Sequence, residues 1–372
     1  MITVGIISEY NPFHNGHLRQ IEAIRASFEE EVTIVALMSG NFVQRGTFAI
    51  YPKFCRAEVA VRAGVDVVLE LPYPWSGSCA ETFALGGVSL ATSLGLDYLS
   101  FGSESGNLAE LVAEKDRLCS QEFQQAMDQA VKKDPKTPYA VLRERVYEAL
   151  YHTPCAKKPN DILSVAYLTA IERLKSPIKP LVIKREGKES ATASRAAILS
   201  GQSEELRSLV PQCSYDMAQK LSPTDMQALG CGLIKDWLLM EREDIDGIFE
   251  MTEDLYYLLR NAAMYAKTEQ EFLENCANRS YTNARIRRVL LSSMFGVRRE
   301  MLFEAPAYTV MLGLSRRGRE FVLESRFPIL KRMAGIRYYG ENVFRQWKFA
   351  ERADQVYYLV DRNRHRFKAY VE

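Results

Sequence analysis

The chain has 372 residues, of which 47% are hydrophobic and 26% are charged, and its formal net charge is +1. This composition excludes a disordered, collagen-like or strongly basic protein, and the length favours two domains over one. Seven scattered cysteines without a Cys-x-x-Cys pair argue against a zinc ribbon or a disulfide framework, and no apolar run reaches the ~18 residues of a membrane span, so we expect a cytoplasmic protein.

The first hundred residues alternate short apolar runs with amphipathic stretches. Strands are expected at 3–8, 32–38, 66–71 and 98–101, with helices between them at 16–28, 52–63 and 80–94. Continuous apolar strands separated by amphipathic helices are typical of a parallel sheet covered on both faces, so we expect a Rossmann-like α/β fold. Because ligands of such sheets bind outside the carboxyl ends of the strands, the loops after these strands should converge on one pocket.

The pattern changes further along the chain. Residues 105–175 are mainly helical, and a last strand is expected at 181–185. Beyond residue 201 the strand–helix alternation stops, and helices are expected at 217–229, 246–265, 269–276 and 283–295. We therefore place a boundary near residue 200, between an α/β domain at 1–200, which should carry the ligand pocket, and a mostly helical, basic domain at 201–372.

Two of the four histidines form the sequence His14-Asn15-Gly16-His17, directly after the first strand. The helix that begins there offers free backbone N–H groups and a partial positive charge, both of which suit phosphate. We expect the imidazoles near the α- and β-phosphates of a nucleotide, with Gly16 facing the ribose or base. The alternative is a pair of capping or solvent-facing histidines.

A second helix start resembles the first. Ser190 and Thr192 precede the helix that ends near Gly201, which is typical of an N-cap with a spare hydroxyl, and Arg195 follows one turn later. We expect Ser190, Thr192 and Arg195 to contact phosphate, with an ordinary capped helix start as the alternative.

Three single residues are candidates on weaker grounds. Gly102 ends the fourth strand, where it could admit a ligand or simply adopt a turn. Asn160 could bind a ligand or only cap the following helix, and Arg185 could pair with phosphate or lie on the surface. Lys53 and Arg56 lie one turn apart on a helix and are expected on a solvated face, with a position at the pocket as the alternative.

Basic residues cluster in the second half, at 285–299, 316–319 and 362–368, with aromatic residues nearby. Arginine and lysine supply salt-dependent phosphate contacts, and aromatic rings stack on bases of single-stranded RNA. We interpret this half as RNA-binding, with a soluble arginine-rich helix surface as the alternative.

The motifs together resemble those of the bacterial tRNA(Met) cytidine acetate ligases, in the His-x-Gly-His nucleotidyltransferase superfamily. The resemblance spans essentially the whole chain and thins after residue 200. It rests on the runs Val4–Ile7, Asn11–His17, Ser39–Gly46, Arg56–Glu58, Leu69–Pro72, Phe101–Glu104, Lys158–Asn160, Ser190–Thr192 and Arg285–Arg288. This sequence departs from the superfamily's Ser-x-Thr-x-Ile-Arg element, because Ser194 occupies the position that is usually apolar. We expect this serine to loosen the helix start.

The resemblance implies an ATP-dependent, AMP-forming ligase that activates acetate as acetyl-adenylate and acetylates N4 of the wobble cytidine, position 34, of elongator tRNA(Met). It implies that Mg²⁺ accompanies the ATP, that His14 and His17 are catalytic, and that Arg285, Arg287 and Arg288 bind tRNA. The implied ATP-binding residues are Ile7, Ser8, Glu9, Tyr10, Asn11, Pro12, Phe13, His14, Asn15, Gly16, His17, Leu18, Arg19, Gln20, Gly102, Asn160 and Arg185.

Two other functions fit the motifs. A small-molecule nucleotidyltransferase would use the same phosphate contacts but would need no basic helical domain, and it would transfer AMP instead of releasing it. A non-catalytic RNA-binding protein could retain the fold, although the intact histidine pair argues against it. A class I aminoacyl-tRNA synthetase is disfavoured because no Lys-Met-Ser-Lys-Ser-like loop is present. The sequence does not indicate the oligomeric state, the acetate pocket or the group that accepts the amine proton.

Overall fold

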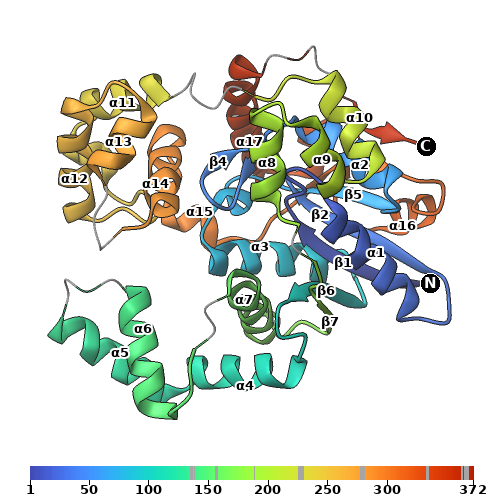
Figure 1. The fold of residues 1–372 in the computed structure, drawn as a ribbon, viewed down its shortest axis with the longest axis horizontal. Helices are drawn as coiled ribbons and strands as arrows, with labels where there is room; N and C mark the ends of the chain where they lie inside the picture. The colour runs from blue at the N-terminus through green and yellow to red at the C-terminus, as the bar shows by residue number, and fades with distance from the viewer. Residues whose placement is uncertain are drawn as a thin grey trace.

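The protein is described from a computed structural model that covers residues 1–134, 137, 139–155, 158–187, 189–224, 230–276, 281–331, 335–361, 363 and 368–372. At its centre is an eight-stranded sheet with the order β10-β8-β5-β2-β1-β6-β7, in which β9 pairs with β8 beside that path (Figure 1). A separate two-stranded hairpin is formed by β3 and β4. The strands are β1 (Ile2–Ser8), β2 (Val32–Ser39), β3 (Phe42–Val43), β4 (Thr47–Phe48), β5 (Val67–Leu71), β6 (Tyr98–Ser103), β7 (Lys179–Lys184), β8 (Thr309–Leu314), β9 (Ile329–Leu330) and β10 (Tyr370–Val371).

The five strands predicted from the sequence form the parallel part of the sheet, in the order β5-β2-β1-β6-β7. The chain winds outward in one direction from β1 to β5 and in the other from β6 to β7. The order therefore reverses between β1 and β6, and in doubly wound sheets the ligand crevice opens at that point, outside the carboxyl ends of the strands. The histidine loop follows β1, and Gly102 lies near the end of β6.

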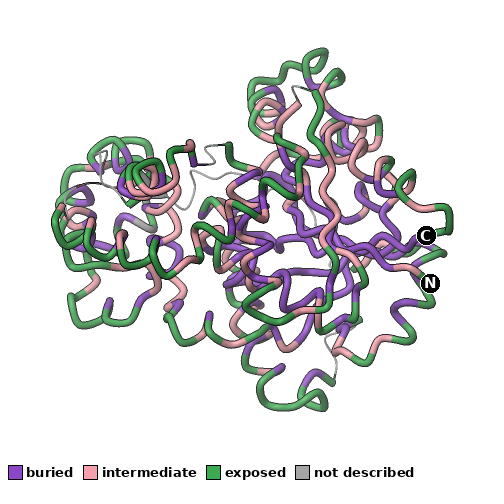
Figure 2. The backbone as a smooth tube through the Cα atoms, turned by 90° about the horizontal axis from the view of Figure 1, so that it is seen from below, coloured by how far each residue is buried: buried purple, intermediate pink, exposed green. Residues whose placement is uncertain are grey.

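Alternation of side chains along the strands produces two cores, one on each face of the sheet. Ile34 and Ala36 of β2 pack with apolar residues of α1 and α2, whereas Val35 and Leu37 pack with residues of α3 and α7. Figure 2 shows this buried centre as continuous purple segments. Burial on both faces explains why β2 and β5 read as uninterrupted apolar runs.

Helices cover the sheet and extend from it in two groups. The first group, α4 to α6, has its own core around Phe123 and Tyr147, and the second, α11 to α14, has one around Trp237 and Phe272. Figure 1 draws α5, α6 and α11 to α14 to the left of the sheet, and α4 below it. The α-helices are α1 (Asn15–Ala26), α2 (Lys53–Arg62), α3 (Ala80–Ser93), α4 (Leu108–Cys119), α5 (Gln121–Lys133), α6 (Tyr139–Tyr151), α7 (Pro159–Arg173), α8 (Ala191–Leu199), α9 (Ser203–Leu209), α10 (Gln212–Lys220), α11 (Gly230–Leu239), α12 (Glu253–Tyr265), α13 (Glu269–Asn275), α14 (Asn283–Phe295), α15 (Arg299–Phe303), α16 (Arg319–Glu324) and α17 (Glu341–Val360).

The chain after residue 200 is mostly helical, as expected, but its last part returns to the sheet. β8 pairs antiparallel with β5, and β9 and β10 both pair parallel with β8. A boundary near residue 200 would therefore cut through the sheet, because β1 to β7 precede that residue and β8 to β10 follow it. The helices of this half that have a core of their own are α11 to α14. Strand β8 was not predicted, because a six-residue apolar run fits a buried strand and a buried helix segment equally well.

Some helices after residue 200 lie at the predicted positions, and others do not. Helices α13 and α14 occupy the predicted ranges. Helix α12 starts at Glu253, later than the expected 246, and α10 ends at Lys220, while residues 225–229 of the expected helix 217–229 lie outside the described residues. Within the described chain, the helices all fall short of the length and apolar character that a bilayer crossing demands, and no disulfide joins the six cysteines whose side chains are described.

Candidate active site

The two histidines face each other at the start of α1. His14 is the N-cap residue, and its Nδ1 accepts the backbone N–H of Gly16 at 3.1 Å. The Nδ1 of His17 in turn accepts the backbone N–H of His14 at 3.1 Å, and the rings stack with their centroids 3.7 Å apart. A neutral imidazole whose Nδ1 accepts a hydrogen bond carries its proton on Nε2. Both rings therefore present an Nε2–H donor, and no described residue bonds to either Nε2.

Both imidazoles are neutral near pH 7. Burial lowers the pKa of His14 to about 4, with a further lowering from the charge of Arg185. Burial also lowers the pKa of His17 well below its usual value, as do the neighbouring His14 and Arg185. His14 is 4% exposed, whereas His17 is half-buried but packed against the rings of Tyr10 and Phe13. The pair is thus built to donate hydrogen bonds to an anion and not to act as an acid in the free protein.

Three arginines lie within electrostatic range of the pair. The positive charges of Arg185, Arg19 and Arg195 each lower the pKa of His14, although burial lowers it more. Arg19 is ion-paired with Glu189. Arg185 follows β7 and is exposed, and its guanidinium makes only a 3.4 Å hydrogen bond, to the Glu189 carbonyl, among the described residues. The guanidinium is therefore available to an anionic ligand.

The second helix start forms as the sequence predicted. Ser190 is the N-cap of α8, and its hydroxyl accepts the backbone N–H of Ala193 at 3.1 Å. Ser194 does not loosen this start: it is fully buried, and its hydroxyl donates to the Ser190 carbonyl one turn back. Arg195 reaches the histidine loop, where its Nη1 donates to the Asn11 carbonyl at 2.7 Å, and its Nη2 donates to the exposed Thr192 hydroxyl at 3.3 Å.

Two glycines make room for the side chains of His14 and Arg185. A Cβ on Gly16 would lie 2.9 Å from Cε1 of His14, so the glycine lets the ring fold over the helix start and does so independently of any ribose. A Cβ on Gly102 would lie 3.1 Å from Cγ of Arg185. Gly102 does not have a positive φ, so the turn interpretation is wrong; its lack of a side chain lets the Arg185 stem cross the end of β6.

Asn160 is tied to the loop after β6. It occupies the second position of α7, whose N-cap is Lys158, so the expectation that Asn160 caps this helix is wrong. Its Nδ2 donates to Oε1 of Glu104 at 2.6 Å, and the backbone N–H of Asp161 donates to Oε2 of the same carboxylate at 3.0 Å. Asn160 therefore fixes the loop that lies beside Gly102.

The remaining residues of the histidine loop mainly hold its shape. Tyr10 has a left-handed φ of 44°, which is uncommon for a bulky residue and occurs where surrounding contacts enforce it. The Asn11 side chain accepts the backbone N–H of Ile50 at 2.8 Å. Asn15 donates to the Ser208 carbonyl and Gln20 to the Ser100 hydroxyl. Ile7, Ser8, Asn11, Pro12 and Phe13 are buried, and Leu18 is half-buried.

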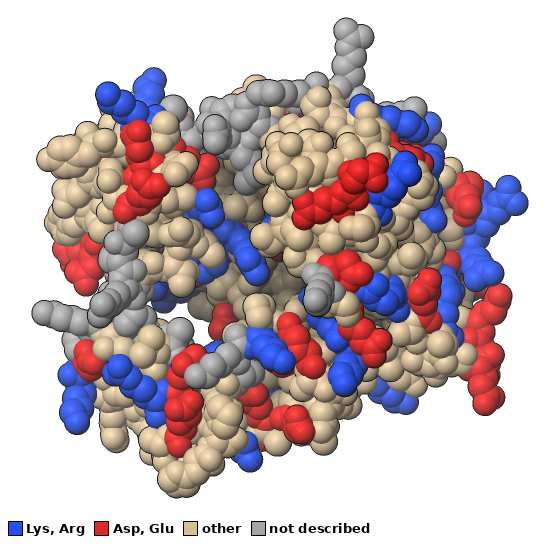
Figure 3. Space-filling view, viewed as in Figure 1, with Lys and Arg blue, Asp and Glu red and all other residues tan. Residues whose placement is uncertain are grey.

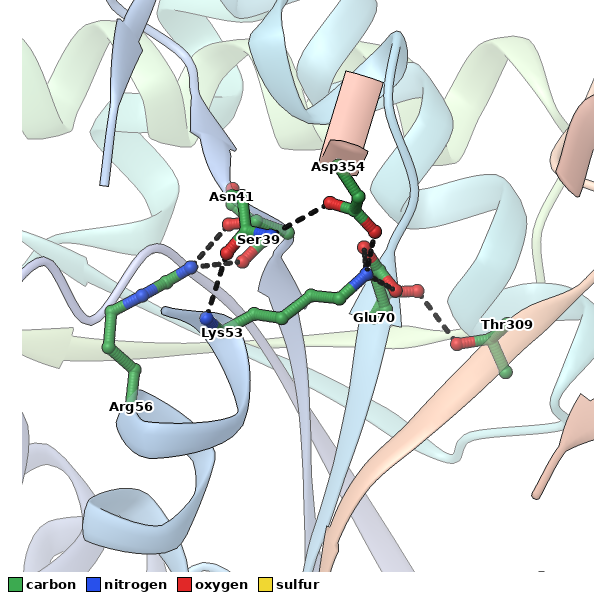
Figure 4. Close-up of polar contacts among 8 residues, drawn as sticks. Ser39, Asn41, Lys53, Arg56, Glu70, Thr309 and Asp354 are labelled. Carbon is green, nitrogen blue, oxygen red and sulfur yellow. Dashed lines mark hydrogen bonds and ion pairs between the residues drawn. The ribbon is translucent and has the colours of Figure 1, made fainter. Parts of the chain in front are cut away.

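A buried ion network lies at the carboxyl ends of β2 and β5 (Figure 4). The Nζ of Lys53 donates to both carboxylate oxygens of Glu70, at 2.7 and 2.8 Å, and to Asp354 of α17. Asn41 accepts the backbone N–H of Lys53 at 2.9 Å and donates to Asp354 at 2.8 Å. Burial raises the pKa of Glu70 to about 7 against the lowering by Lys53, and the two carboxylates raise the pKa of Lys53 although its burial opposes them.

Arg56 completes this cluster. It is fully buried, and it donates to the backbone carbonyls of Tyr51, Glu9, Ser39 and Gly40. The expectation that Lys53 and Arg56 face solvent is therefore wrong. A signal was present in the sequence: Glu70 interrupts an apolar strand, and a carboxylate in a buried strand needs a buried cation.

The three predicted tRNA-binding arginines lie on α14 and already have partners. Arg288 makes a bidentate pair with Glu250, at 2.6 and 2.7 Å, in which the side chains are only 12% and 14% exposed. Arg287 pairs with Glu269 at 3.0 Å and is 33% exposed. Arg285 donates to the Glu250 carbonyl and lies over the Tyr281 ring. Arg288 therefore mainly stabilises the fold through its buried ion pair, whereas the side chains of Arg285 and Arg287 are partly exposed to solvent.

The molecule is hollowed between the sheet and the two helical groups, and Lys and Arg side chains lie along part of the hollow (Figure 3). A pocket of about 340 Å³ lies between α17 and the turn after β5. None of the residues that line it belongs to the histidine loop. Trp75, Phe344 and Phe349 line it together with Arg345, Lys348 and Arg352. Aromatic faces beside basic side chains are the combination used by single-stranded nucleic-acid sites.

The chain is similar to known proteins along nearly its whole length. The model of the HIGH Nucleotidyl Transferase family matches residues 1–370. The tRNA(Met) cytidine acetate ligase of Thermoanaerobacter sp. (strain X514) is 31% identical over 360 residues, 89% of this chain and 88% of that protein. The protein of the same name from Syntrophotalea carbinolica is 33% identical over 356 residues, 88% of this chain and 83% of that protein. The crystal structure of Thermotoga maritima TmcAL bound with alpha-thio ATP is similar with a TM-score of 0.89 and 29% identity, covering 98% of this chain and 95% of that one.

Proposed function

Because this chain belongs to the tRNA(Met) cytidine acetate ligases, within the HIGH nucleotidyltransferase family, we propose that it uses ATP to activate acetate and transfers the acetyl group to tRNA(Met). The acetylated atom is N4 of the wobble cytidine, position 34, of the elongator tRNA. Because its substrates are ATP and tRNA, we expect the reaction to take place in the cytoplasm.

The observation that carries the proposal is the stacked histidine pair at the reversal point of the sheet. The two Nε2–H groups have no partner among the described residues, and they belong to the loop that follows β1, the strand beside β6. Arg185, Arg195 and the α8 start add positive charge around them. Neutral donors combined with fixed guanidinium groups stabilise a polyphosphate without the pair itself carrying charge.

In the first step an oxygen of acetate attacks the α-phosphorus of ATP, and the bond to the β-phosphate oxygen breaks. Acetyl-adenylate and pyrophosphate form. Negative charge grows on the non-bridging α-oxygens and on the leaving oxygen, where His14 and His17 donate their Nε2–H groups. Arg185 and the Ser190–Thr192 start of α8 hold the leaving pyrophosphate. Removing one preorganised donor of this kind typically costs about 10²–10³ in rate.

In the second step the exocyclic amine of cytosine attacks the acetyl carbon, and AMP leaves. The base must leave the anticodon stack to reach the site, which costs least for an unpaired base. The exposed parts of Arg285 and Arg287, together with the basic hollow, supply the phosphate contacts that hold the tRNA.

Mg²⁺ accompanies the nucleotide in this proposal. The groups around the phosphates are imidazole N–H and guanidinium donors, which do not ligate Mg²⁺, so oxygen atoms of the phosphates and water would hold it. The ion would neutralise charge on the leaving pyrophosphate.

Acetate-dependent exchange of label between pyrophosphate and ATP tests the proposal. We expect exchange with acetate and ATP in the absence of tRNA, and AMP release only when tRNA(Met) is added. Acetyl-CoA should not replace acetate plus ATP; if it did, the adenylate scheme would be wrong. Transfer of AMP to a small molecule would instead identify a nucleotidyltransferase, and absence of exchange would leave an RNA-binding protein.

A further inference from the structure

We infer that Glu9 is the general base of the acetyl-transfer step, with its Oε2 accepting the proton of the attacking cytosine amine. The inference rests on the proposed function. Glu9 directly follows β1, on the ligand side of the sheet, and is half-buried. Its charge raises the pKa of Arg195, which burial lowers more strongly, so the carboxylate lies close to an arginine of the phosphate site.

Glu9 is held firmly while one of its oxygens stays available. Its Oε1 accepts the backbone N–H of Gln44 at 3.0 Å, and its backbone carbonyl accepts a hydrogen bond from buried Arg56. Within the described chain, no residue bonds to Oε2. A base fixed through one oxygen and open at the other is suited to take a proton at a defined position.

The other carboxylates of the site are engaged. Both oxygens of Glu104 accept hydrogen bonds, from Asn160 and from the backbone of Asp161. Glu189 is ion-paired with Arg19, and Glu70 accepts two hydrogen bonds from Lys53. Taking a proton at any of these would break a charge-assisted contact.

The histidines do not fit the role either. In each ring Nδ1 accepts a backbone N–H and Nε2 carries the proton, so neither nitrogen has a free lone pair. The nearby Tyr167 hydroxyl is buried without a partner among the described residues. Burial raises its pKa, as does the charge of Glu9, so it stays protonated as a donor.

The acetyl-transfer step conserves atoms and charge. The N4 lone pair forms a bond to the acetyl carbon, and the bond from that carbon to the AMP phosphate oxygen breaks, with AMP keeping the electron pair. The proton leaves N4 for Oε2 of Glu9 and passes from there to solvent. The first step needs no such base, because acetate attacks as an anion. Glu9 therefore acts as a base in transfer and not in adenylation.

The test separates the two steps in the full-length protein. Glu9→Gln keeps an oxygen for the Gln44 N–H but removes the base. At saturating ATP we expect acetate-dependent ATP–pyrophosphate exchange to persist, whereas single-turnover transfer from preformed acetyl-adenylate to tRNA slows about 10²–10⁴-fold. Hydroxylamine, an acceptor that needs no base, should trap the acetyl group equally well in both proteins.

Glu58→Gln is the matched control, because Glu58 pairs with Arg62 on the same helix and takes no part in the site. Wild-type transfer by Glu9→Gln would overturn the inference and assign the proton to the adenylate phosphate or to water. Loss of exchange in Glu9→Gln would also overturn it, because Glu9 would then serve adenylation. Absence of exchange in the wild-type protein would instead refute the proposed function.

Discussion

Gly46 lies against the backbone of Arg288. A Cβ on this glycine would be 2.4 Å from the backbone nitrogen of Arg288, and the glycine has a φ of +69°. The contact joins the β3–β4 hairpin to α14. Because the same hairpin donates the Gln44 N–H to Glu9, it connects the predicted tRNA-binding helix with the loop that carries the histidines.

We predict that Gly46→Ala separates the hairpin from α14. The new methyl group would meet backbone, which cannot move aside as a side chain can, so overpacking should cost about 1–3 kcal/mol of unfolding free energy. The matched control is Gly296→Ala, which has nearly the same φ, +68°, but no atom within 4 Å of the added Cβ. Equal losses in denaturant melts of the two variants would attribute the effect to backbone strain and not to the contact.

The arginines of α14 should divide by burial. Arg288→Ala leaves Glu250 buried without its partner, which typically costs about 3–5 kcal/mol, so we predict a marked fall in the melting temperature. Arg287→Ala should cost at most about 1 kcal/mol and should lower the salt dependence of tRNA binding by about one unit of slope. Arg62→Ala, which removes the pair with Glu58 on α2 and lies outside the basic clusters, serves as the control. An unchanged slope for Arg287→Ala would make that residue ordinary surface.

The parallel part of the fold could be predicted because local signals and the tertiary structure agree. Strands such as β2 are apolar throughout since both faces are covered, and the histidine motif directly follows β1. The N-cap role of Ser190 was also readable, because capping depends on residues only three apart.

The rest depended on contacts between distant parts of the chain. Lys53 and Arg56 have the spacing of a solvated face, and their burial follows from Glu70, Asp354 and backbone carbonyls far away in sequence. The pairing of β8 with β5 joins residues about 240 positions apart, for which local periodicity gives no signal. Gly102 was noticed for its place, but only the structure places Arg185 against it.

We predict that Gly102→Ala weakens ATP binding through Arg185. The added methyl group would lie 3.1 Å from Cγ of Arg185 and push the stem away from the end of β6. Loss of one charge-assisted contact is worth about 1.5–3 kcal/mol, so the Kd for ATP, measured by calorimetry, should rise about 10–100-fold. Gly232→Ala, which meets no atom within 4 Å, is the control. Arg185→Ala removes the guanidinium itself, and an unaltered Kd in both variants would mean that Arg185 does not bind the nucleotide.

Acidification should destabilise the free protein through His14. Its pKa is about 4 in the folded state, because of burial and then Arg185, against an ordinary value of 6.5. Between these values the unfolded chain binds more protons, so stability falls as the pH drops from 6.5 towards 4, by at most on the order of 3 kcal/mol for this group. His17 acts in the same direction. Urea unfolding as a function of pH measures this, and His14→Gln should reduce the slope; an identical slope would place the titration elsewhere.

Only one nitrogen of His17, Nε2, is free to donate a hydrogen bond to phosphate. Its Nδ1 is occupied by the His14 N–H, so only the Nε2–H can reach a phosphate. In a histidine replacement, the amide of Gln reaches roughly the position of Nε2, whereas the shorter Asn reaches only that of Nδ1. His17→Asn should keep the contact to the His14 backbone but slow acetate-dependent ATP–pyrophosphate exchange about 10²–10³-fold, the usual cost of one lost donor. His17→Gln should lose less. Both variants should bind tRNA like the wild type, since the arginines of α14 are untouched. If His17→Asn exchanged faster than His17→Gln, the donor would be Nδ1 and the hydrogen-bonding scheme of the pair would have to be reversed.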